Sequence, residues 1–288
     1  MLAVYKKELQ SFYQNMLGYV FAAFLLVVSG IMTMSYCLGA TPQNTFEYTY
    51  GSMPFIYIII IPILTMNSIA GEMRNKTDQM LYTSPVSIWK IVTAKYLAMC
   101  TVLLIPLLLT LFYPVILMRY GNISMTTSAS SMFAFFLLGC SLIAIGMFIS
   151  SLTDSQILSA VISFGVLFII YTASQIQYYI SRTSYASAVF FAVIGILIGF
   201  VVRKLTKSTL TGIASALIVF GGIIYLFLTN QKSLEGAAST AIGTFALFTK
   251  IENFIYGIFD INAIVYFISI IIFFNYLCIQ SIDKRRWN

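Results

Sequence analysis

Long runs of apolar residues, separated by short polar connections, fill most of the chain. A helix that crosses a bilayer needs about 20 mainly apolar residues, and eight runs approach or exceed this length. They are residues 17–38, 53–71, 91–118, 132–152, 157–180, 186–202, 210–228 and 261–282. The sixth run is short, so it and the seventh form either two spans or a re-entrant pair. The pattern predicts an all-α polytopic membrane protein with six to eight transmembrane helices.

The first 16 residues carry a different pattern, in which apolar side chains recur every three or four positions. These side chains are Leu2, Tyr5, Leu9, Phe12, Tyr13 and Met16. The polar residues Lys6, Lys7, Glu8 and Gln10 fall between them. This spacing predicts an amphipathic helix over residues 1–16 that lies in the membrane interface. Such a helix serves either as a functional surface or only as an anchor.

The connection over residues 230–260 lies between the seventh and eighth runs. Its second half carries large apolar residues at helical spacing, namely Phe245, Phe248, Ile251, Phe254, Ile255 and Ile258. It is too apolar for a free loop and too interrupted to cross the bilayer comfortably. The pattern predicts an amphipathic or re-entrant segment on the extracytoplasmic side.

Residues 72–95 form the longest polar and charged stretch within the apolar part of the chain. Ser84-Pro85 is a helix-start signal, because Ser caps a helix and Pro is tolerated at its first position. A helix is therefore predicted from Val86 into the third span. The apolar residues 80–82 sit among charged neighbours, a pattern suited to binding a groove in a soluble partner. An ordinary cytoplasmic loop is the alternative.

Composition supports a membrane protein with a single domain over residues 1–288. Charged residues make up 9% of the chain, against about 25% in soluble domains. The net charge of +7 is explained by topology, so a nucleic-acid partner is not expected. With the N-terminus inside and eight crossings, twelve cationic residues lie on the inside: Lys6, Lys7, Arg74, Lys76, Lys90, Lys95, Arg203, Lys204, Lys207, Lys284, Arg285 and Arg286. The four on the outside are Arg119, Arg182, Lys232 and Lys250. This positive-inside bias predicts that both termini are cytoplasmic.

Few residues offer candidate chemistry. The chain has no histidine, the side chain that most often serves as a general base or metal ligand. It has no G-x-x-x-x-G-K-[ST] motif for ATP, and its acidic residues map to loops or the ends of apolar runs. Catalysis within the chain is therefore not expected. An ion-coupled secondary carrier would keep ionisable groups near the midplane. It stays an alternative, as does a non-transporting anchor or force-transmitting subunit.

A group of polar and aromatic residues lies late in the fifth apolar run. It comprises Tyr171, Gln175, Gln177, Tyr178 and Tyr179. These side chains are typical either of an aromatic belt at the membrane interface or of an outer vestibule on a transport path.

The polar stretch resembles the coupling segment of ABC type-2 export permeases, whose pattern is roughly E-x-x-R-x-G-T-x-E-x-L-L-x-T-S-P-V-S followed by I-V-x-G-K. The matching residues are Glu72, Thr77, Leu81, Thr83, Ser84, Pro85, Val86, Ser87, Ile91, Val92 and Lys95. The sequence departs from the pattern at Lys76 (usually glycine), Gln79 (usually acidic), Met80 and Ala94. Residues 72–90 are called the coupling segment below.

Both ends of the chain are similar to the gliding-motility-associated branch of these permeases. At the start, the similarity rests on Lys7, Glu8, Leu9, Ser11, Phe12, Gly18, Tyr19, Val20, Phe24, Ser29 and Gly30. At the end, it rests on residues 254–260 (FIYGIFD), Tyr266, Phe267 and residues 284–287 (KRRW). The resemblance covers the first 95 and last 40 residues, whereas residues 181–230 hold an apolar hairpin that shorter members lack.

The resemblance implies a permease subunit that works as a pair, each copy joined to a separate cytoplasmic ATPase subunit. It implies no cofactor in this chain, since ATP and Mg²⁺ would bind the ATPase partner. The implied ATPase-facing residues are Glu72, Arg74, Thr77, Leu81, Tyr82, Ser84, Pro85 and Ser87, with Lys7, Glu8 and Phe12 of the interfacial helix. A second permease copy or paralogue, an extracytoplasmic accessory subunit and membrane lipid are the other expected partners. The expected location is the bacterial cytoplasmic membrane.

Overall fold

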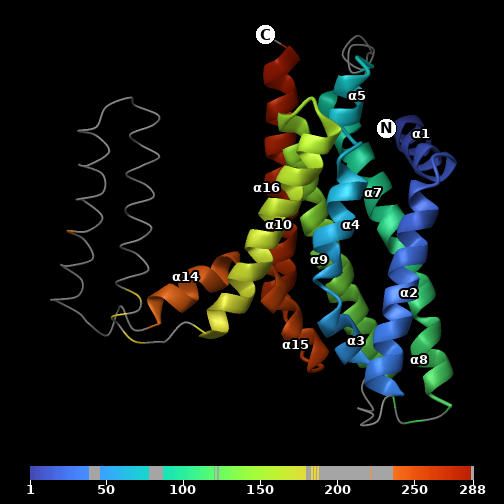
Figure 1. Cartoon of the computed structure of the whole chain (residues 1–288), viewed down its shortest axis with the longest axis vertical. Helices are drawn as coiled ribbons and strands as arrows, with labels where there is room; N and C mark the ends of the chain where they lie inside the picture. Colours follow the sequence, from blue (N-terminus) through green and yellow to red (C-terminus); the bar gives the residue numbers. More distant parts are fainter. Residues whose placement is uncertain are drawn as a thin grey trace. The chain divides into compact units, whose positions relative to one another are not determined.

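The computed structural model describes residues 1–38, 46–77, 87–119, 121, 123–179, 183, 185, 187, 221 and 236–286 (Figure 1). Over these residues the regular structure is helical, and no strand occurs among them. Six helical segments are long and apolar enough to cross a membrane: Leu17–Cys37, Ile56–Arg74, Ile88–Leu117, Met125–Leu152, Gln156–Gln177 and Ile261–Arg285. The prediction of an all-α polytopic membrane protein is thereby confirmed. The runs predicted at 186–202 and 210–228 lie outside the described residues, apart from 187 and 221.

The chain divides into two compact units, residues 1–169 with 250–288 (unit 1) and residues 170–249 (unit 2). Unit 1 contains α1 (Leu2–Gln14), α2 (Leu17–Cys37), α3 (Glu47–Ser52), α4 (Ile56–Thr65), α5 (Ala70–Arg74), α7 (Ile88–Thr110), α8 (Phe112–Leu117), α9 (Met125–Leu152), α15 (Glu252–Ile255) and α16 (Ile261–Arg286). Helix α10 (Gln156–Tyr179) begins in unit 1 and ends in unit 2. In its described part, unit 2 also contains α14 (Ala237–Phe245) and the start of the 3₁₀ helix η1 (Leu247–Ile251).

Helix α9 forms the centre of unit 1, where it packs against α16, α7 and α4. Two of its glycines allow close approach of neighbouring helices. A Cβ at Gly139 would collide with Leu103 of α7 and Tyr57 of α4, and one at Gly146 would lie 2.6 Å from Thr65 Oγ1 of α4. Small residues at helix contacts are the usual means of packing in a membrane, because lipid supplies no hydrophobic driving force.

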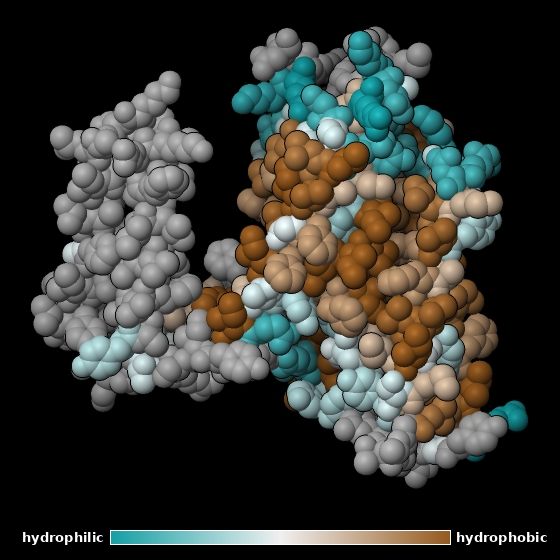
Figure 2. Space-filling view, in the orientation of Figure 1, coloured by the Kyte–Doolittle hydropathy of each residue, from teal (hydrophilic) through white to brown (hydrophobic). Residues whose placement is uncertain are grey.

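The two ends of unit 1 differ in composition. We call the "α5 end" the one that holds α1, α5, the first turn of α7 and the last turn of α16 (Figure 1). The other, the "α3 end", holds α3, α8 and α15. Figure 2 shows hydrophilic residues gathered at the α5 end and a hydrophobic belt over the visible face of the helices beside it. A hydrophilic end next to a hydrophobic belt is the distribution expected of a protein whose helices cross a bilayer.

The second predicted span, 53–71, is interrupted. Helix α4 ends at Thr65, and α5 begins only at Ala70. The intervening residues contain Asn67 and Ser68, whose side chains compete with the helical hydrogen bonds of the backbone. The freed backbone groups are bonded by other helices, as described below.

Two predicted helix starts are wrong. The fourth span begins at Met125 rather than 132, because Ser124 caps it and accepts a hydrogen bond from Thr127 N. The hydroxyls of Thr127 and Ser128 donate hydrogen bonds to the buried carboxylate of Glu47 on α3. These polar residues therefore lie in the helix and not in a loop. The helix predicted from Val86 begins at Ile88, since Ser87 has an extended backbone.

The described part of residues 230–260 folds into the short helices α14, η1 and α15. None of these is among the six candidate spans. The amphipathic or re-entrant interpretation of this segment, and its place on the extracytoplasmic side, stay predictions.

Candidate functional site

A buried lysine lies at the centre of the α5 end. Lys95, on the second turn of α7, is 3% exposed, and its Nζ lies 2.9 Å from Glu8 Oε1 of α1 and 2.8 Å from Glu72 Oε1 of α5. The same ammonium donates a hydrogen bond to the carbonyl oxygen of Ser68 at 3.2 Å. An ammonium carries three N–H donors, and each here has an acceptor. We call Glu8, Lys95 and Glu72 the ion triad.

The ion triad fixes the arrangement of three elements. Glu8 and Glu72 are largely buried, at 14% and 18% exposure. Charges taken out of water are costly unless they are paired, and removing one partner of a buried pair typically costs about 3–5 kcal/mol. Helices α1, α5 and α7 are therefore held together at the α5 end by a contact that tolerates little separation.

The ion triad also connects the first residue of the coupling segment with a lysine that follows the segment. Glu72 precedes the stretch 78–86, which lies outside the described residues, and Lys95 follows it. Because these two side chains are in direct contact, both ends of the segment are anchored at one point. The ion triad thus connects α1, α5 and α7 at this point.

The break between α4 and α5 is stabilised by side chains from two further helices. Ser150 Oγ of α9 accepts hydrogen bonds from Ile69 N (3.3 Å) and Ala70 N (3.0 Å), and so satisfies the first N–H groups of α5. Gln156, the first residue of α10, donates from Nε2 to Asn67 Oδ1 at 2.7 Å. The break is therefore an ordered interruption of the helix, in which Ser150 bonds the N–H groups of Ile69 and Ala70. Helix α5 is a short helix that follows it.

Helix α5 ends in a Schellman motif. The N–H of Thr77 donates to Glu72 O, and that of Lys76 donates to Met73 O. Lys76 occupies the left-handed position of this motif, with φ 55°, where glycine is favoured because a Cβ is strained there. This geometry explains why glycine is usual at this position in the resembled family and identifies Lys76 as a strained replacement.

A polar cavity of about 240 Å³ lies beside the ion triad. Its lining residues come from α1, the start of α2, the α4–α5 break, α5 with its cap, and α7: Lys7, Glu8, Ser11, Phe12, Asn15, Leu17, Asn67, Ser68, Gly71, Glu72, Asn75, Thr77 and Lys95. At the same end, Arg74, Thr77, Ser87 and Trp89 are exposed, Trp89 to 59%. The α5 end thus combines a buried ionic centre with an accessible polar surface.

The structure brings together some of the predicted site residues. Glu8 and Glu72 meet at Lys95, Phe12 is buried, and Lys7 lines the same cavity. Leu81, Tyr82, Ser84 and Pro85 lie outside the described residues. Their assignment to an ATPase-facing surface stays a prediction.

The residues predicted for a vestibule are partly packed within unit 2. The rings of Tyr171 and Phe248 pack edge to face, with their centroids 5.2 Å apart. The side chain of Gln177 lies against Gly243. Gln175 is exposed, whereas the side chain of Tyr178 is outside the described part. These contacts do not test whether the residues line a transport path, so the outer vestibule stays a prediction.

Lys95 is the central residue that the sequence interpretation did not assign to the site. The sequence predicts it as an inside cation and as a match to the family pattern, although it is also the one charged residue in the apolar run 91–118. An ionisable residue in an apolar run is costly and usually functional, so this signal was present. Ser150 and Gln156 gave no comparable signal, because their role depends on contacts between helices.

Comparison with protein families gives a match that covers these elements. The family model described as ABC-2 family transporter protein matches residues 2–190, which include α1, α5, α7, the start of α10 and the whole ion triad. No curated protein matches the chain. The match extends over more than half of the 288 residues. The chain therefore belongs to the ABC-2 family of transporter proteins and is a membrane-spanning permease, a class whose members work with an ABC ATPase subunit.

Proposed function

We propose that this chain is the permease subunit of an ATP-driven exporter that works as a pair of permeases with separate ATPase subunits. ATP and Mg²⁺ would bind the ATPase partner and not this chain. The similarity of both chain ends to the gliding-motility-associated branch supports export and an extracytoplasmic accessory subunit. The proposed location is the bacterial cytoplasmic membrane, with both termini and the α5 end in the cytoplasm.

The observation that carries the proposal is the ion triad. A loop that only connected two spans would have no need for a buried lysine that ties its two ends to an N-terminal helix. Lys95 makes contacts of 2.8–2.9 Å with carboxylates on α1 and α5. An arrangement of this kind suits a surface that receives force from a soluble partner and passes it to several helices.

In the proposed mechanism, closure of the ATPase pair displaces the coupling segment. The segment moves α5, which is separated from α4 by the break at residues 66–69. Because Lys95 ties α5 to α1 and α7, these elements move as one body. Their movement relative to α9 and α16 alternates access to a path between the two permeases. ABC-2 permease domains are membrane components, so the chemical step belongs to the partner.

The proposed cargo is partly apolar, or is a chain threaded between the two permeases, since few fixed charges occur in the spans. Tyr171, Gln175, Gln177 and Tyr178 are proposed to line an outer vestibule. Residues 230–260 are proposed as the contact for an accessory subunit.

Co-purification tests the proposed partnership. The tagged chain is extracted in mild detergent, and ATPase activity and bound subunits are measured for the wild type and for Leu81→Asp with Pro85→Gly. We expect an ATPase subunit to co-purify with the wild type and to be lost from the double variant. A matched control, Pro42→Gly with Gln43→Asp in the loop between the first two spans, keeps the partner. If no nucleotide-hydrolysing subunit co-purifies with the wild type, the carrier or anchor alternatives replace this proposal.

A further inference from the structure

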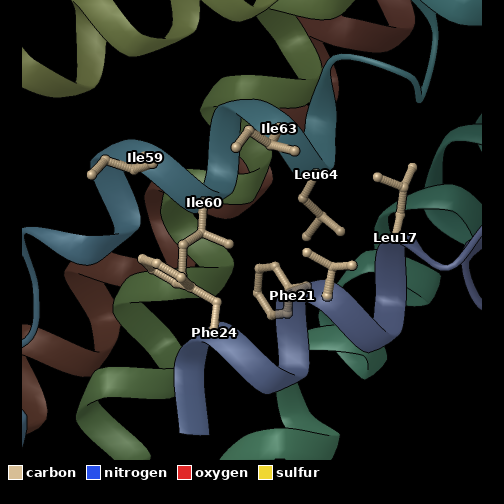
Figure 3. Close-up of a pocket in the computed structure, with 8 residues that line it drawn as sticks. Leu17, Phe21, Phe24, Ile59, Ile60, Ile63 and Leu64 are labelled. Carbon is tan, nitrogen blue, oxygen red and sulfur yellow. The ribbon is translucent and has the colours of Figure 1, made fainter. Parts of the chain in front are cut away.

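An apolar groove runs along the candidate spans α2 and α4, next to the α5 end. One wall consists of Leu17, Val20, Phe21 and Phe24 of α2, and the other of Ile59, Ile60, Ile63 and Leu64 of α4. Figure 3 shows side chains from both helices converging on the space between them. It encloses about 140 Å³ and has no polar surface. From Leu17 to Phe24 it follows about 10 Å of helix.

The groove adjoins the polar cavity beside the ion triad. Leu17, the first residue of α2, lines both spaces. On the opposite wall, Leu64 lines the groove, and Asn67 and Ser68 of the α4–α5 break line the cavity. Both walls thus change from apolar to polar within one helical turn. A space with an apolar part between two candidate spans and a polar part at its edge matches an amphiphile.

The polar part offers groups of both charge signs. Lys95 uses one oxygen of Glu8 and one of Glu72, and the second oxygen of each has no partner among the described residues. The hydroxyl of Ser68 is buried and also lacks a hydrogen-bond partner in the described part of the chain. Lys7 is an exposed cation and makes no ion pair with any described residue.

These charges favour a headgroup that itself carries both signs. A purely anionic headgroup would meet two carboxylates, whereas an ammonium group is attracted to the oxygens of Glu8 and Glu72, and a phosphate is attracted to Lys7. We propose that the groove and the polar cavity together bind a zwitterionic aminophospholipid. The first carbons of one acyl chain lie between α2 and α4, the ammonium lies near Glu8 and Glu72, and the phosphate lies near Lys7.

Lipid retention tests this proposal without an ATPase partner, so its outcome is independent of the proposed coupling function. The full chain is reconstituted with equal amounts of phosphatidylethanolamine and phosphatidylglycerol of the same acyl chains, washed in detergent, and its retained lipid quantified by mass spectrometry. Ile63→Trp fills the groove, and Lys7→Gln removes the phosphate contact. Matched controls are Ile105→Trp on α7, since Ile63 and Ile105 are similarly exposed (45% and 42%), and Lys6→Gln on α1.

We expect the wild type to retain phosphatidylethanolamine in preference to phosphatidylglycerol. Ile63→Trp and Lys7→Gln each lower the retained amount about tenfold, the change expected for the loss of one good contact, and the controls keep it. Ile59→Trp provides a second groove variant should Ile63→Trp not give monodisperse protein. Equal retention of the two lipids overturns the headgroup assignment. Equal retention by the groove variants and Ile105→Trp overturns the site.

Discussion

Glu72 Oε1, on the first residue of the coupling segment, lies 2.8 Å from Nζ of Lys95, which follows the segment. Glu8 of α1 joins the same ammonium at 2.9 Å. The contact holds the start of the segment against the helix that follows its end. It also means that the amphipathic N-terminal helix is connected to the segment through a buried charge.

Replacing the lysine is expected to destabilise the α5 end. Lys95→Met leaves two largely buried carboxylates without their cation, which should lower the free energy of unfolding by about 3–5 kcal/mol. Chemical or thermal unfolding in detergent measures this change. The triple variant Glu8→Gln, Lys95→Met, Glu72→Gln removes all three charges and should recover most of the loss. If Lys95→Met and the triple variant are equally unstable, the loss comes from packing and not from charge.

Relieving the strain at the end of α5 is expected to stabilise the protein. Lys76 adopts φ 55°, a conformation that costs a non-glycine residue about 1–2 kcal/mol. Lys76→Gly should therefore raise the free energy of unfolding by about 1 kcal/mol, part of the gain being offset by backbone entropy. Lys90→Gly, within α7, should lower it by a similar amount. Hydrogen exchange at Thr77 should slow in Lys76→Gly; faster exchange there would show that the motif does not form.

The inter-helix cap at the start of α5 should be measurable with a pair of serines on α9. Ser150→Ala removes the acceptor for Ile69 N and Ala70 N, with an expected cost of about 1–2 kcal/mol. Ser141 is equally buried, but its hydroxyl bonds the Leu138 carbonyl of its own helix and no other described residue. Ser141→Ala should therefore cost clearly less. Comparable losses for the two variants would argue against the cap.

Much of the fold follows from the sequence because its signals are local. Apolar length predicts the span 17–38 almost to the residue, and α2 covers Leu17–Cys37. The break in the second span was not predicted, because Asn67 and Ser68 break a helix only where Ser150 and Gln156 supply other hydrogen bonds. For the site, Glu8 and Glu72 were identified from a family pattern, whereas their meeting at Lys95 depends on the packing of α1 against α7.

The close contact of α9 with α4 should make one glycine intolerant of substitution. An alanine Cβ at Gly146 would lie 2.6 Å from Thr65 Oγ1 and 3.0 Å from its Cγ2. Gly146→Ala should therefore lower the free energy of unfolding by about 1–3 kcal/mol through overpacking. A Cβ added at Gly165 of α10 would have no described neighbour within 4 Å, so Gly165→Ala should be neutral or stabilising by up to about 1 kcal/mol. Thermal unfolding of the two variants side by side checks this order; a reversed order would contradict the packing.

Acid should loosen the start of α16. The side-chain amide of Asn253 donates to Asp260, and the backbone N–H groups of Asn262 and Ala263 do so as well, which lowers the pKa of the Asp260 carboxyl. Since the folded pKa is below the unfolded one, this stabilisation is complete above the ordinary Asp value. It is lost as the pH falls through the lowered value. In the wild type, the protection of the first-turn amides of α16 against hydrogen exchange, relative to their intrinsic exchange rate at each pH, should fall with acid. Asp260→Asn should remove this dependence; an unchanged dependence would assign it to another group.

The central claim is that the ion triad makes α1, α5 and α7 move as one body when the partner binds ATP. Electron–electron distance measurements on the assembled complex test it with spin labels at the exposed residues Gln10 of α1, Lys90 of α7 and Gln280 of α16. We predict that ATP changes the Lys90–Gln280 distance and leaves the Gln10–Lys90 distance narrow and constant. In Lys95→Met, the Gln10–Lys90 distance should broaden or shift with ATP. A Gln10–Lys90 distance that shifts equally in both proteins, or a Lys90–Gln280 distance that ATP does not change, would contradict the account.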